Sequence, residues 1–103
     1  MNRIPKSFRV GGQDVNVCEV DRCENDSLGR CSVAEGLIEI AKTFRGCKQS
    51  DSVKLNTFYH ELIHTILDTM SEHELSSNER FVSTLSSFLT EAIRSFNYES
   101  END

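Results

Sequence analysis

Long hydrophobic runs and an excess of positive charge are both missing from this sequence. No apolar stretch approaches the roughly 20 residues that cross a bilayer, and residues 1–6 lack the apolar core of a signal peptide. We therefore expect a cytoplasmic protein without membrane attachment. The formal net charge of -6 disfavours nucleic acid, whose phosphates require a positive surface. A neutral or basic peptide or protein fits this charge better as a partner.

The sequence also lacks a Cys-x-x-Cys pair, although it contains four cysteines. Their intervals do not match the common zinc-binding patterns, and disulfides are unexpected in a reducing cytosol. We expect free thiols, with a disulfide or a structural metal site as the alternatives. The residues concerned are Cys18, Cys23, Cys31 and Cys47.

With 103 residues, 37% of them hydrophobic and 27% charged, the chain has the size and composition of one small domain. No internal repeat is visible. We place this domain at 1–97 and interpret the acidic, polar residues 98–103 as a disordered tail.

The N-terminal half has the residue pattern of β-strands. Apolar and polar residues alternate over 7–10 and 15–20, on either side of Gly11-Gly12-Gln13-Asp14, which predicts a hairpin. A third strand is predicted over 37–40. We expect an α+β fold in which a small N-terminal antiparallel or mixed sheet packs on two antiparallel helices.

The stretch His60-Glu61-Leu62-Ile63-His64 carries the strongest functional signal. Apolar residues around it recur at three- and four-residue intervals, which predicts an amphipathic helix capped by Ser50 or Asp51 and ending near Met70. Residues four apart lie on nearly the same side of a helix, so both imidazoles can bind one Zn²⁺. Glu61 lies beside them, where a carboxylate can act as a general base on water without binding the metal.

Both histidines fall outside the apolar stripe of their helix, so burial in the core does not explain them. The alternative is that they are two solvated surface histidines without a metal. We favour a metal site, because a catalytic zinc ion normally takes three protein ligands and further candidates lie downstream.

The third ligand is expected on or near a second helix, which begins after a short connection with Ser77 or Asn78 as its N-cap. Glu79 then lies in the first turn of this helix and points toward the first helix, so we favour it as the ligand. His73, or neither residue, is the alternative. The second helix also carries a sustained apolar stripe: Phe81, Val82, Leu85, Phe88, Leu89, Ala92, Ile93 and Phe96.

The histidine motif, followed by Asn78-Glu79 and Phe81-Val82, resembles the small gluzincin-type metallopeptidases found in phage and prophage proteins. The likeness extends upstream over a β region ending at Leu28-Gly29 and a strand over 36–40, so it covers most of the chain. It implies a minimal zincin-like fold. In larger zinc peptidases an edge strand beside the cleft binds the substrate backbone, and residues 37–40 are our candidate, with an ordinary buried strand as the alternative.

The resemblance also implies residue roles. The family binds zinc through two histidines and a downstream glutamate and activates water with the motif glutamate, which here implies His60, His64 and Glu79 as ligands and Glu61 as the base. Larger gluzincins often have an Asp one turn after the glutamate ligand to orient a histidine, whereas this chain has Ser83. We expect Asp68 to orient His64 instead.

The expected activity is zinc-dependent hydrolysis of peptide bonds in a peptide or protein substrate. The alternatives are a non-catalytic protein whose helices zinc holds together and an acidic interaction or inhibitor protein in which the motif is accidental. A homo-oligomer or a protein partner could supply the selectivity that so short a chain lacks.

Overall fold

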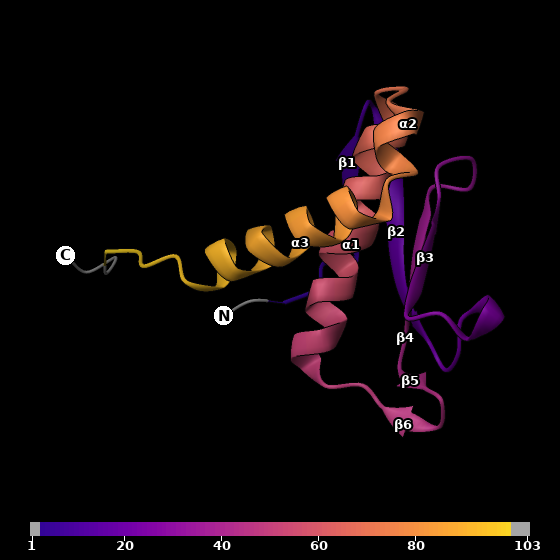
Figure 1. Ribbon diagram of the computed structural model, residues 1–103, viewed down its shortest axis with the longest axis vertical. Coiled ribbons are helices and arrows are strands. Elements are labelled where there is room, and N and C mark those ends of the chain that lie inside the picture. The colour runs from indigo at the N-terminus through magenta and orange to yellow at the C-terminus, as the bar shows by residue number, and fades with distance from the viewer. Residues whose placement is uncertain (1–2, 100–103) are drawn as a thin grey trace.

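A computed structural model describes residues 3–99 (Figure 1). Within this range the elements are a mixed β-sheet, three α-helices, a small hairpin and one turn of 3-10 helix at Glu24–Asp26. The α+β class is confirmed. The sheet strands are β1 (Ser7–Val10), β2 (Gln13–Val20), β3 (Gly29–Ser32) and β4 (Leu37–Ala41). The hairpin consists of β5 (Thr43–Phe44) and β6 (Cys47–Lys48), and the helices are α1 (Asp51–Thr69), α2 (His73–Ser76) and α3 (Glu79–Arg94).

The strands of the sheet lie in the order β1-β2-β4-β3. β1 and β2 form the predicted hairpin, and its turn residues Gly11 and Gly12 have φ values of 60° and 79°, which favour glycine. β2 and β4 are parallel, whereas β3 pairs with β4 in antiparallel fashion. The sheet is therefore mixed.

β4, the predicted strand at 37–40, lies in the interior of the sheet and not at its edge. It pairs on one side with β2 and on the other with β3, and Ile38 and Ile40 are fully buried. Its alternative interpretation, an ordinary buried strand, is confirmed. The edge beside α1 belongs to β3, which the sequence pattern did not predict, because Gly29-Arg30-Cys31-Ser32 is short and does not alternate clearly.

α1 begins and ends close to the predicted positions. The Ser50 side chain accepts a hydrogen bond from the Val53 amide at 3.2 Å, which caps the helix, and Met70 is its C-cap. One side of α1 packs on the sheet through Phe58, which lies in a core cluster with Val15, Ile38 and Ile40.

α3 runs back antiparallel to α1, as predicted, and splays away from it toward the C-terminus (Figure 1). Its Asn78 side chain accepts a hydrogen bond from the Phe81 amide at 3.0 Å. Near its start Val82 is fully buried against α1, whereas near its end contact is made by the long side chain of Arg94, whose Nη1 donates to Ser52 Oγ at 2.8 Å.

None of the described helices is long and apolar enough to cross a bilayer. Of the predicted tail, Tyr98 and Glu99 are exposed and belong to no helix or strand, and residues 100–103 lie outside the described range. In the structure Cys18, Cys23, Cys31 and Cys47 are all free, so no two of them form a disulfide.

Candidate metal centre

The imidazoles of His60 and His64 converge on the carboxylate of Glu79. His60 Nε2 lies 3.2 Å from Glu79 Oε1, and His64 Nε2 lies 3.2 Å from Glu79 Oε2. The candidate donor atoms of the three residues all lie within 4.8 Å of one another. The structure therefore brings together the residues that the sequence predicted as ligands.

Two features of local structure produce this convergence. His60 and His64 lie one turn apart on α1, with ring centroids 4.9 Å apart. Glu79 is the first residue of α3, and burial of Val82 against α1 turns this end of α3 toward the histidines. The antiparallel path of α3 therefore supplies a donor that α1 alone cannot place.

The donor set fits a zinc ion. Donors bound at about 2.0–2.1 Å to a tetrahedral ion lie about 3.3 Å from each other. Here each histidine nitrogen lies 3.2 Å from one of the two Glu79 oxygens, and the candidate donors of the three residues lie within 4.8 Å of one another. Among the described residues no fourth His, Cys, Asp or Glu joins the cluster. Two imidazoles and one carboxylate match the ligand set of a catalytic zinc site that keeps one position for water or substrate.

Glu61 lies beside this cluster and is 8% exposed. Burial raises the pKa of its carboxyl above the usual range, and the nearby imidazoles of His60 and His64 partly oppose that rise. A buried carboxyl with a raised pKa next to a candidate metal site has the properties of a general base.

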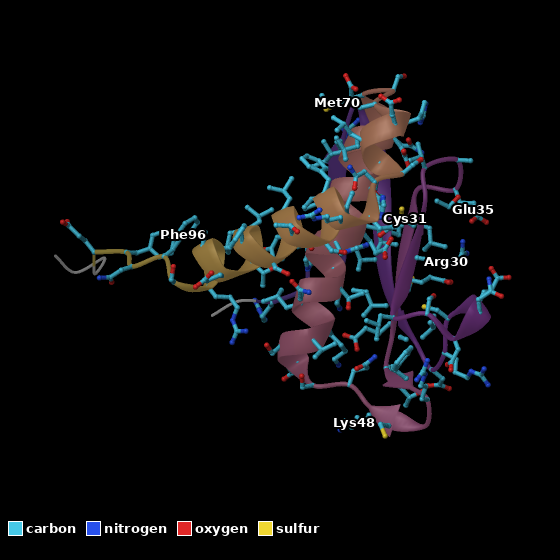
Figure 2. All side chains as sticks on the ribbon, viewed as in Figure 1. Arg30, Cys31, Glu35, Lys48, Met70 and Phe96 are labelled. Atoms are coloured by element: carbon cyan, nitrogen blue, oxygen red, sulfur yellow. The ribbon has the colours of Figure 1, made fainter. Side chains whose placement is uncertain are left out.

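The edge strand β3 approaches α1 closely at Glu61. A Cβ atom on Gly29 would lie 2.6 Å from Thr57 Cγ2 and 3.4 Å from Glu61 Cγ, so only glycine allows this approach without a shift. Two residues further on, Cys31 faces the helices, whereas Arg30 and Glu35 lie on the opposite side (Figure 2). β3 thus forms one wall of the site.

The thiol of Cys31 lies beside the Glu61 carboxyl group in the wall of the same pocket. Burial, reinforced by the charge of Glu61, raises the pKa of this thiol to about 12. The thiol is therefore protonated at neutral pH and can donate to the carboxylate, which opposes the rise in the Glu61 pKa. The position of Cys31 beside Glu61 was not predicted, because the sequence pattern did not predict the strand that carries this residue.

A pocket of about 640 Å³ opens between β3, α1 and α3, and the cluster lies in its wall. This volume is in the usual range for small-ligand and substrate sites. The pocket is lined mainly by polar residues, among them Ser27, Thr57, Asp68, Ser83 and Ser86.

Ser76 of α2, and not Asp68, contacts the outer nitrogen of His64. Ser76 Oγ lies 3.0 Å from His64 Nδ1, and Ser76 is 7% exposed. Asp68 instead lies 3.5 Å from Nδ1 of His73, whose side chain is 71% exposed. The expected role of Asp68 is therefore wrong, and His73 lies outside the metal-ligand cluster.

The sequence missed Ser76 because the four-residue helix α2 is too short to produce an apolar repeat. The only signal was its position in the short connection between the two ligand-bearing helices. Any hydroxyl in that connection was a candidate for contact with a histidine.

Comparison of the chain with models of known protein families, with curated proteins and with solved structures found no match.

Proposed function

We propose that this protein is a zinc-dependent metallopeptidase that hydrolyses peptide bonds in the cytoplasm. The observation that carries the proposal is the convergence of His60 Nε2 and His64 Nε2 on the Glu79 carboxylate at 3.2 Å, with the buried Glu61 beside them.

Glu61 moves the proton in the proposed reaction. Zinc, when bound by the three ligands, supplies Lewis acidity that acidifies water and polarises the scissile carbonyl. Glu61 takes a proton from the attacking water as its oxygen bonds to the carbonyl carbon. It then returns this proton to the amine nitrogen as the C–N bond breaks, which leaves a carboxylic acid and an amine.

The edge strand β3 is the proposed binding site for the substrate backbone. Among the described residues β3 pairs only with β4, so its other side can accept an extended peptide by strand addition. Gly29 brings this strand against α1 at Glu61, which places a peptide bound there next to the base.

Orientation of His64 is the proposed role of Ser76. When its hydroxyl accepts a hydrogen bond from Nδ1–H, the Nε2 lone pair of His64 is available to a metal ion. The same hydroxyl can donate to Nδ1 when Nε2 carries the proton and donates to Glu79. The contact therefore suits both the metal-free and the metal-bound state.

A variant of the base separates catalysis from metal binding. Glu61→Gln should retain zinc, measured by elemental analysis, and should lose about 100-fold or more in the rate of hydrolysis of a peptide library. The matched substitution Glu74→Gln, on an exposed residue of α2 outside the cluster, should retain both properties. Equal hydrolysis by the Glu61→Gln variant and the parent would refute the assignment.

A non-catalytic zinc protein is the second candidate, and one observation favours it. Among the described residues, the buried apolar cluster between α1 and α3 contains Ile63, Leu67 and Val82, with the partly buried Leu89 packed against it. Because this contact is small, a metal ion joining the two helices would add much to their association. In that case zinc would raise the melting temperature of the parent and of Glu61→Gln alike, and neither would hydrolyse any peptide.

A further inference from the structure

The outward side of α3 carries a second apolar stripe, which we call the outer face. It consists of Phe81, Leu85, Phe88 and Ala92. Phe81 is 38% exposed, Leu85 41% and Phe88 66%, and Ala92 is also exposed. Their intervals of four, three and four residues place them along one side of the helix, as in the seam of a coiled coil.

The outer face is distinct from the side of α3 that packs on α1. Packing on α1 uses Val82, with Leu89 beside it, and these residues lie about 100° around the helix from Phe81. A hollow of about 420 Å³ is formed on the outer face and is lined in part by Phe81, Leu85 and Phe88. An exposed apolar stripe with a hollow in it is typical of an interaction surface.

We infer that the outer face binds a second copy of this chain, with the two α3 helices antiparallel about a two-fold axis. In such a pair Phe81 of one copy lies opposite Ala92 of the other, and Leu85 lies opposite Phe88. Each phenylalanine then packs against an aliphatic side chain of the other copy, and the hollow can accept an aromatic ring from that copy.

The charges beside the outer face favour this occupant. Arg80 and Glu91 lie on the same flank of the stripe, and neither has an ion-pair partner among residues 3–99. In an antiparallel pair, the same flank of each helix faces its counterpart with the residue order reversed. Arg80 of each copy therefore lies within one helical turn of Glu91 of the other. A two-fold interface requires a surface that is complementary to itself, and this arrangement provides it.

The dimer would leave the metal centre open. Glu79 lies about 150° around the helix from the outer face, so its carboxylate stays directed toward α1. An interface made mainly by one pair of helices is at the small end of the size range for specific complexes, so we expect a micromolar dissociation constant.

Sedimentation equilibrium of the full metal-free chain tests the proposal independently of the proposed function, because the outer face contains no metal ligand. The parent should change from monomer to dimer as its concentration rises through the micromolar range. Phe88→Glu should weaken association by about 100-fold without lowering the melting temperature, because Phe88 is 66% exposed. Val53→Glu, a control on α1 at a residue 40% exposed, should associate like the parent.

Charge reversal tests the orientation. Arg80→Glu and Glu91→Arg should each weaken the dimer by about 10-fold, because each places like charges opposite each other twice in the pair. The double variant Arg80→Glu/Glu91→Arg should restore association to the level of the parent. The proposal would be overturned if the parent stayed monomeric at several hundred micromolar, or if Phe88→Glu did not weaken the dimer. The antiparallel arrangement would be overturned if the double variant did not restore association.

Discussion

The two sides of α1 differ in how firmly they are held. Toward the sheet, α1 packs through Phe58 into a cluster with Val15, Ile38 and Ile40, and partly buried side chains surround it. Toward α3, its apolar contact is the small cluster of Ile63, Leu67 and Val82. His60, Glu61 and His64 therefore sit on a firmly supported helix, whereas Glu79 sits on a loosely supported one. In the proposed zinc site, metal binding and docking of α3 would therefore be coupled.

The largest effect is expected on the free energy of unfolding, when a buried side chain on either side of α1 is truncated to alanine. Ile38→Ala should lower the free energy of unfolding by about 2–5 kcal/mol, because Ile38 is fully buried in the sheet cluster. Val82→Ala should cost less, about 1–2 kcal/mol, because α3 can shift to fill the space. Urea denaturation of the metal-free variants measures both values. Equal costs would contradict the difference in support.

Zinc should act mainly on the weakly packed side. At about 100 times the dissociation constant, zinc should add about 2.7 kcal/mol to the free energy of unfolding. Glu79→Ala should weaken zinc binding by more than about 100-fold, because loss of a ligand lowers the affinity more than loss of a hydrogen bond to a ligand does. Zinc should therefore no longer stabilise this variant. Thermal unfolding with and without zinc measures the effect, and Glu74→Ala on the exposed surface of α2 is the control. Unchanged zinc binding in Glu79→Ala would remove α3 from the site.

A smaller effect is expected at Ser76, which links α2 to the firmly held histidine. Ser76→Ala should weaken zinc binding by about 10-fold, because His64 loses the contact that orients its ring. Competition with a chromophoric chelator measures this affinity. Ser77→Ala is the matched control, because the Ser77 hydroxyl bonds to the His73 carbonyl and not to a ligand. The same loss in both variants would indicate a general effect on α2.

The smallest effect concerns the buried charge of Glu61 in the metal-free protein. Burial raises the folded-state pKa of Glu61 above its unfolded value, so its contribution to stability is fully present below the unfolded pKa and is lost as the pH rises through the folded pKa. Glu61→Gln removes this loss and should raise the melting temperature at pH 7 by a few degrees relative to the parent. The difference should shrink or reverse near pH 4, as calorimetry in the presence of a chelator can measure. A variant that is less stable than the parent at pH 7 would contradict the sign.

Structural features that depend on residues close in the sequence were predicted better than those that depend on contacts between distant segments. The caps Ser50 and Asn78 act over three residues, and each was one of the two candidates that the sequence offered for its helix. The hairpin turn was predicted at the right place but two residues too long, because Gln13 and Asp14 belong to β2. The strand order depends on contacts between distant segments. The sequence pattern could not show whether residues 37–40 form an edge strand, because this depends on their pairing with β3.

The sequence alone determined that His60, Glu61 and His64 share one region of a helix surface, because helical geometry depends only on residue spacing. It also placed Glu79 in the first turn of the next helix. Only the tertiary structure decided that Ser76 contacts His64, that β3 lies against Glu61 and that the outer face of α3 is exposed. These outcomes depend on how the elements pack against each other, and packing is decided by the shapes and burial of all surfaces together rather than by any local pattern.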